Sequence, residues 1–125
     1  MSLQSYRELI VWQKAMDAVI IIYKLAEKLP PEEKFGLKQQ VQRASVSIAA
    51  NIAEGYGRSH RGDYLRFLSF AKGSLCEVET FLIMFTRLNF LSKEDVREVW
   101  ELLQEIGKML QSMINNLSQN PKTIP

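Results

Sequence analysis

Few residues of the sequence have the types and spacing that catalysis or metal binding needs. The chain has one histidine, His60, and one cysteine, Cys76. A metal centre built from several histidines or cysteines therefore cannot form within one chain. Glu77 and Glu79 are two residues apart and point to different faces of a helix, so they are not paired acid–base carboxylates. Cys76 borders an apolar stripe, which predicts a small packing residue.

The glycine-rich segment in the middle of the chain does not match a phosphate-binding loop. Gly57 and Gly62 have the required spacing, but Asp63 and Tyr64 follow where a lysine and a serine or threonine are needed. Gly55 and Gly57 lack the third glycine of a dinucleotide-binding fingerprint and follow a helical pattern instead of a strand. We therefore expect a protein that is not an enzyme and that holds no cofactor and no metal.

A polar row crosses the second helical segment beside its apolar stripe. It consists of Arg43, Ser47, Asn51 and Glu54. Such a row is either a solvated helix face or a partnered polar seam, because a buried polar group is tolerated only with a partner. If the chain turns back near residue 60, Arg43 faces Glu77, and Ser47 faces Gly73 and Ser74. We predict a seam that includes Glu77, with an ion pair from Arg43 to Glu77 or Glu79. Small residues at 71, 73 and 74 would let the two helices approach closely.

Basic residues are concentrated in the middle of the chain. Residues 34–76 carry seven basic and two acidic side chains, whereas residues 77–106 carry three basic and seven acidic ones. Guanidinium groups near an aromatic ring suit phosphate contacts and base stacking, although a short solvated loop or mutual neutralisation of two helices would also explain the pattern. The residues predicted to bind nucleic acid are Arg58, His60, Arg61, Arg66, Lys34 and Lys38.

The elements that position these residues are helical throughout. Apolar residues recur at alternating steps of three and four, and Pro30-Pro31, the glycines at 55–62 and Asn89–Ser92 separate the segments. This pattern predicts helices over 7–29, 33–55, 61–89 and 93–118. Short connections between them indicate an all-α, antiparallel up-down-up-down four-helix bundle. The expected domain covers residues 1–119, with a flexible tail at 120–125. Its N-terminal segment lacks a signal-peptide pattern, so we expect a cytoplasmic protein without a membrane segment.

The apolar stripes are wider than the core of one bundle needs. On the first helix the predicted core stripe is Leu9, Trp12, Met16, Val19, Tyr23 and Ala26, and Ile10 and Ile21 lie well away from it. The third and fourth helices carry second rows, which are Phe67, Ser74, Phe81 and Leu88, and Trp100, Gly107 and Ile114. Each large side chain left in water forgoes about 1.5–3 kcal/mol of burial. Either the protomers associate through these rows, or the monomer has a thick, irregular core.

Several ordered motifs resemble one known family. The central motif is Arg43-Ala44 with Ser47-Ile48 and Asn51-Ile52-Ala53-Glu54-Gly55. The others are Leu9–Ala15, Pro31 with Glu33 and Phe35-Gly36-Leu37, and Phe67-Leu68 with Ala71, Gly73-Ser74-Leu75 and Glu77. Together, over roughly residues 7–117, they resemble the four-helix bundle family named for proteins encoded by intervening sequences in bacterial 23S rRNA genes. The chain is similar, too, to the accessory variability determinant of diversity-generating retroelements.

The resemblance implies an antiparallel bundle that assembles as a homopentamer. In the retroelement relative the pentamer is basic, binds nucleic acid and partners a reverse transcriptase. The ribosomal name reflects the location of the genes. Two hypotheses follow. The first is an oligomeric module that binds nucleic acid, structured RNA above all, through its basic surface. The second is an oligomeric scaffold that holds a protein partner, such as a reverse transcriptase by analogy, and never touches nucleic acid.

Overall fold

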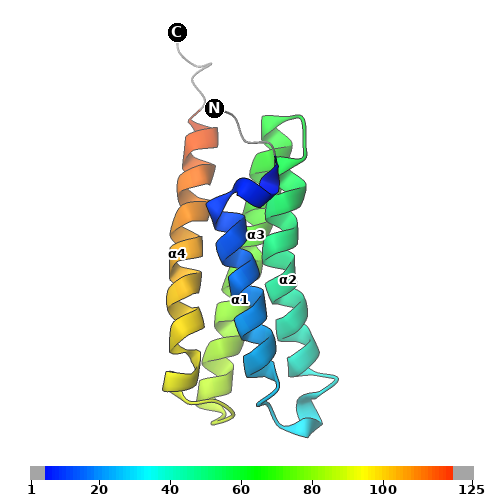
Figure 1. The fold of residues 1–125 in the computed structure, drawn as a ribbon, viewed down its shortest axis with the longest axis vertical. Coiled ribbons are helices and arrows are strands. Elements are labelled where there is room, and N and C mark those ends of the chain that lie inside the picture. The colour runs from blue at the N-terminus through cyan, green and yellow to red at the C-terminus, as the bar shows by residue number, and fades with distance from the viewer. Residues whose placement is uncertain (1–4, 120–125) are drawn as a thin grey trace.

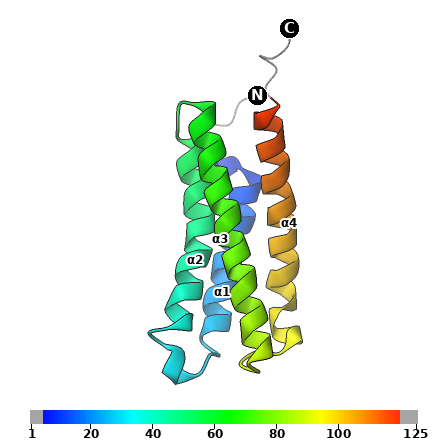
Figure 2. The same cartoon turned by 180° about the vertical axis from the view of Figure 1, so that it is seen from behind.

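The four predicted helices form one antiparallel bundle in the computed structural model, which describes residues 5–119. Neighbours in the chain are neighbours in space, and the last helix returns to the first (Figures 1 and 2). This arrangement confirms the predicted up-down-up-down bundle. The elements are a 3-10 turn η1 (Tyr6–Glu8), α1 (Ile10–Ala26), a 3-10 turn η2 (Pro31–Glu33), α2 (Leu37–Tyr56), α3 (Arg61–Arg87) and α4 (Lys93–Ser118). The tail predicted at 120–125 lies outside the described residues.

Two of the helices begin later than predicted. The backbone of Leu9 is extended (φ −74°, ψ 124°), so residues 6–8 form η1 and α1 begins only at Ile10. Before α2, Gly36 departs from helical geometry (φ −113°, ψ −107°) and separates η2 from the helix. The proline pair thus starts a short 3-10 turn instead of leading directly into a long helix.

The start of α4 carries a complete capping box. Asp95 N–H donates to Ser92 Oγ over 3.0 Å, and Ser92 N–H donates to Asp95 Oδ2 over 2.9 Å. Ser92 is therefore the N-cap of α4, at the end of the Asn89–Ser92 break that the sequence indicates. The hydrogen bond from the Ser92 backbone lowers the pKa of Asp95, and bonds from the Lys28 ammonium and the Ser92 hydroxyl lower it further. Lys28 Nζ lies 3.2 Å from Asp95 Oδ1, which ties the end of α1 to the start of α4.

The core matches the predicted stripes on three helices and differs on the first. The steps of three and four predict core stripes of Leu37, Val41, Ala44, Ile48 and Ile52 on α2, of Tyr64, Leu68, Ala71, Leu75, Val78, Leu82 and Phe85 on α3, and of Val96, Val99, Leu103, Ile106, Leu110, Met113 and Leu117 on α4. All of these residues are buried except Leu37, Tyr64, Met113 and Leu117, which are partly buried. On α1 the buried residues are Val11, Ala15, Ala18, Ile22, Leu25 and Ala26. The predicted α1 stripe is wrong apart from Ala26, because Met16 and Tyr23 are exposed while Leu9, Trp12 and Val19 are only partly buried. Cys76, predicted as a packing residue, is exposed on α3.

α2 and α3 approach each other closely at Gly55. A Cβ atom at this buried position would lie 2.9 Å from Phe67 Cβ and 3.0 Å from Tyr64 Cδ1. Both neighbours are fixed by the first turns of α3, so a methyl group has no room without moving the helices apart. A Cβ at Gly73, where the sequence suggested close packing, would meet nothing within 4 Å.

Gly55→Ala should lower the free energy of unfolding by about 1–3 kcal/mol, because overpacking at a helix contact outweighs the gain in helix propensity. Urea denaturation followed by circular dichroism measures this. Gly73→Ala is the matched control, since it gains the same helix propensity in open space and should raise stability by about 0.5–1 kcal/mol. An unchanged or higher stability of Gly55→Ala would contradict the close approach.

Candidate functional site

The turn between α2 and α3 gathers four of the six residues predicted to bind nucleic acid. Arg58 Nη2 lies 2.8 Å from Glu54 Oε2, and the Arg58 guanidinium lies over the Phe67 ring at 4.7 Å from its centroid. The Arg66 guanidinium lies over the same ring at 5.6 Å and pairs with Asp63 at 3.5 Å. Phe67 therefore holds two guanidinium groups at one end of the bundle, a role that its place in an apolar row did not predict.

The side chains of the other two residues of the turn, His60 and Arg61, make no polar or ring contacts with residues 5–119. The His60 carbonyl accepts the backbone N–H groups of Asp63 and Tyr64 at the start of α3. The side chains of His60 and Arg61 are exposed, and neither has a hydrogen bond, an ion pair or a ring contact within the described part of the chain. Arg61 is thus the cation of this turn that is available to a ligand without breaking an internal pair.

Two tyrosines form the base of the turn. The rings of Tyr56 and Tyr64 meet edge to face, with centroids 6.2 Å apart. Burial raises the pKa of Tyr64, and the neighbouring Tyr56 raises it further, so Tyr64 stays neutral. Tyr64 packs against the core, and this is the role that its place in the α3 stripe indicates.

Lys34 and Lys38 lie at the opposite end of the bundle from the α2–α3 turn. The full length of α2 separates them from Arg58 and Arg61 (Figure 1). The Lys34 ammonium lies 5.4 Å from the centroid of the Phe35 ring, and Lys38 Nζ lies 3.1 Å from Glu27 Oε2. The six predicted residues therefore do not share one surface. The cluster at the α2–α3 turn is the candidate site, and the two lysines are not part of it.

Hydrogen bonds join Ser47, Asn51 and Ser74 and form the central part of the predicted polar seam. Asn51 Nδ2 donates to the Ser47 carbonyl at 2.8 Å and to Ser47 Oγ at 2.9 Å. Ser74 Oγ of α3 donates to Ser47 Oγ at 2.9 Å. Ser47 and Ser74 face each other as the predicted hairpin requires. These bonds give the part-buried polar atoms between α2 and α3 their partners.

The predicted ion pair of Arg43 is absent. Among residues 5–119, no carboxylate lies within ion-pair distance of its guanidinium, and both Arg43 and Glu77 are exposed. The other proposed acceptor, Glu79, instead accepts a hydrogen bond from Gln104 at 2.6 Å. Each step of four residues rotates a helical position by about 40°, so Arg43 lies one step further from α3 than Ser47 does. The seam is therefore limited to Ser47, Asn51 and Ser74, and Glu54 pairs with Arg58 instead.

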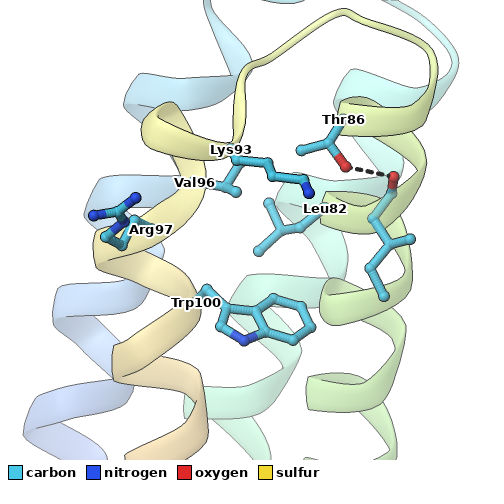
Figure 3. A pocket seen from close by; sticks show the side chains of 7 residues that line it. Leu82, Thr86, Lys93, Val96, Arg97 and Trp100 are labelled. Atoms are coloured by element: carbon cyan, nitrogen blue, oxygen red, sulfur yellow. Dashed lines mark hydrogen bonds between the residues drawn. The ribbon is translucent and has the colours of Figure 1, made fainter.

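Two apolar faces lie on opposite sides of the bundle. On the α1/α2 side, two grooves with volumes of about 460 and 260 Å³ share Val19 and Val46. Their linings also include Trp12, Met16, Ile20, Tyr23, Ala49, Ala50 and Ala53. On the α3/α4 side, a pocket of about 320 Å³ opens beside Trp100 (Figure 3). Trp100 belongs to a row that the sequence identified, but Ile20, Val46 and Ile83 were not singled out.

The α1/α4 side is acidic. Its groove of about 680 Å³ is bounded by Asp17, Glu98, Glu101 and Glu105 around Ile20, Ile21 and Leu102. A phosphate backbone would be repelled there, so this groove does not suit an anionic ligand. Across the described residues, no group of three or more His, Cys, Asp or Glu side chains could hold a metal ion. No described helix is long and apolar enough to cross a membrane.

Comparison with known proteins agrees with the fold and the motifs. A family model described as 23S rRNA-intervening sequence protein matches residues 7–112. A crystal structure of a protein of unknown function from the S23 ribosomal protein family of Bacteroides thetaiotaomicron is similar, with a TM-score of 0.80 and 27% sequence identity. The alignment covers 86% of this chain and 100% of that one. No curated protein matches. The chain belongs to the 23S rRNA-intervening sequence protein family.

Proposed function

We propose that the protein is a non-enzymatic homo-oligomer that binds nucleic acid at the α2–α3 end of the bundle. The observation that supports assembly is the pair of apolar faces on opposite sides of the protomer. Val46 and Ile83, one on each face, are 43% and 42% exposed. Large apolar surfaces of this kind mark sites of association. The resemblance to pentameric relatives favours a pentamer.

The Arg58, Arg61 and Arg66 cluster supports nucleic acid as the ligand. Three guanidinium groups and His60 stand at one end of each protomer, and two of the guanidiniums are held over one aromatic ring. A ring of parallel protomers would repeat the cluster around one rim and make a weak patch multivalent. Phosphate contacts then dominate, with little preference for base sequence. Structured RNA presents the phosphate groups and unpaired bases that such a rim would contact.

A scaffold for a protein partner is the second candidate. It is favoured by the ion pairs of Arg58 with Glu54 and of Arg66 with Asp63, which neutralise half of the four-residue cluster within the protomer. By analogy with the retroelement relative, a reverse transcriptase is one partner of this kind. In this alternative the assembled ring holds the partner and the arginine cluster serves the fold.

Titration of fluorescent structured RNA and duplex DNA against the oligomer distinguishes the two candidates. We expect binding at 50 mM salt to both ligands, and roughly 100-fold weaker binding at 200 mM salt if about four phosphates are contacted. Similar affinity for unrelated sequences should accompany this salt dependence. An oligomer that binds neither ligand at 50 mM salt would contradict nucleic-acid binding and favour the scaffold.

A further inference from the structure

We propose that the α3/α4 pocket beside Trp100 receives the α1/α2 face of a second copy of this chain, so that protomers join head to tail. The inference rests on the proposed self-association and assigns the two surfaces that meet. The residues that would face each other are Ile20 and Val46 of one protomer and Ile83 and Trp100 of the next.

The lining of the pocket suits an apolar side chain. Its walls are Leu82, Ile83, Val96 and Trp100, and the Trp100 indole extends from α4 toward α3 (Figure 3). Its one hydroxyl, Thr86 Oγ1, already donates to the Ile83 carbonyl at 2.9 Å. An aliphatic side chain fits this lining provided that the Lys93 ammonium and the Trp100 indole N–H stay in contact with water, because burial of either group without a partner costs free energy.

Bonds between helices show that the two faces lie at the same level of the bundle. Lys14 pairs with Glu105 at 3.4 Å, and Lys28 pairs with Asp95 at 3.2 Å. These two pairs align residues 14–28, in and just after α1, with residues 95–105 of α4, which run in the opposite direction. Ile20 lies near the middle of the first segment and Trp100 at the middle of the α4 segment, so the two residues lie at the same height along the bundle. Val46 lines the same groove as Ile20.

A hydrogen bond between α3 and α4 adds Ile83 to this level. Glu79 and Gln104 are joined at 2.6 Å, and Ile83 and Trp100 each lie four residues, about one turn, further toward the same end. Four partly or largely exposed apolar side chains therefore lie at one level on two opposite faces.

Matching levels on opposite faces favour a head-to-tail contact. Two copies related by a twofold axis would pair one face with itself and leave the other face of both copies in water. Parallel copies placed side by side bring Ile20 and Val46 onto the Trp100 pocket of the neighbour. Repetition of this contact covers both faces of every protomer when the ring closes.

Charge adds a smaller term to the same contact. Lys93 and Arg97 line the pocket, and Glu27 lines the α1/α2 groove. Arg97 already pairs with Glu94 at 3.1 Å, and Glu27 pairs with Lys38 at 3.1 Å, which leaves Lys93 as the main charge at this contact. Lys24 also lines that groove, so the groove carries one acidic and one basic side chain. Apolar burial is the main contribution, and added salt should change the assembly little.

Cysteine cross-linking tests the pairing of the two faces. In a Cys76→Ser background, which removes the exposed native thiol, Ile20→Cys is combined with Ile83→Cys and treated with a short bismaleimide. We expect a ladder of covalent dimers, trimers and larger species on a denaturing gel. Each single cysteine variant should stay monomeric on that gel, because neither face meets its own copy.

The outcomes separate this inference from the proposed function. Dimers formed by Ile20→Cys alone would overturn the head-to-tail contact in favour of a twofold one. An oligomer by light scattering that yields no ladder would overturn the assigned surfaces while self-association stands. A double variant and a wild type that are both monomeric by light scattering would overturn the inference and the proposed assembly together.

Discussion

Val46→Lys should convert the assembly into monomers at micromolar concentration. Val46 is 43% exposed in the protomer and lines both grooves of the α1/α2 face. In the proposed head-to-tail assembly this position faces the apolar pocket that Lys93 and Arg97 also line. Loss of the apolar contact and burial of an unpaired ammonium together cost at least about 3 kcal/mol per contact. Each contact then weakens by roughly 100-fold or more.

Light scattering measures this change directly, since the chain alone has a mass of 14.4 kDa. Ile10→Lys is the matched control. Ile10 is 53% exposed on the same protein, yet it is eleven residues from Ile21 and so lies on the side of α1 that faces α4. The control should keep the wild-type mass, and both variants should keep the helical circular dichroism spectrum. A Val46→Lys variant with the wild-type mass would contradict assembly through the α1/α2 face.

The exposed apolar residues of α1 also explain why the core stripe of this helix was predicted wrongly. Apolar residues occur on almost every side of this helix, so steps of three and four fit more than one face. The large residues Trp12 and Tyr23 suggested a core, but the bundle interior takes the small Ala15 and Ala18 with Val11 on that helix. On α4 the second apolar row is short and most of the remaining positions are polar, and there the predicted stripe matches the buried residues. Periodicity locates a core most clearly when the opposite face is polar.

Position along a helix is easier to predict than direction around it. The hairpin register placed Ser47 opposite Ser74, and their hydroxyl groups are 2.9 Å apart. It placed Arg43 at the level of Glu77 equally well, yet both side chains are exposed. A count of residues fixes the level, whereas a contact also requires the right rotation about each helix axis. That rotation is set by packing of all four helices, which a single segment does not encode.

The length of α2 alone explains why the predicted basic residues lie at two opposite ends of the bundle. A helix of 20 residues between Leu37 and Tyr56 separates its ends by about 30 Å. Lys34 and Lys38 precede or begin this helix, and Arg58 follows it, so one continuous patch was excluded by the predicted boundaries themselves. The contacts of Phe67 and the pocket beside Trp100 could not be predicted from helix length, because they depend on which side chains of neighbouring helices meet.

Combined reversal of two arginines at the α2–α3 turn, Arg58→Glu with Arg61→Glu, should weaken nucleic-acid binding by at least about 100-fold at 100 mM salt. Each protomer changes by four charge units, and contacts to phosphate are replaced by repulsion. The slope of log affinity against log salt concentration should fall as well. Fluorescence titration of structured RNA at several salt concentrations measures both quantities, and light scattering should show an unchanged oligomer.

Lys34→Glu with Lys38→Glu is the matched control, because it makes the same change of charge at the other end of α2. It should lower affinity far less, since only long-range repulsion acts there and salt screens it. A neutral pair, Arg58→Gln with Arg61→Gln, avoids placing a carboxylate beside Glu54, which Arg58 now contacts at 2.8 Å. Its affinity should lie between wild type and the reversed pair if charge is the cause. Equal losses from reversal at both ends would show that net charge, and not the α2–α3 turn, determines binding.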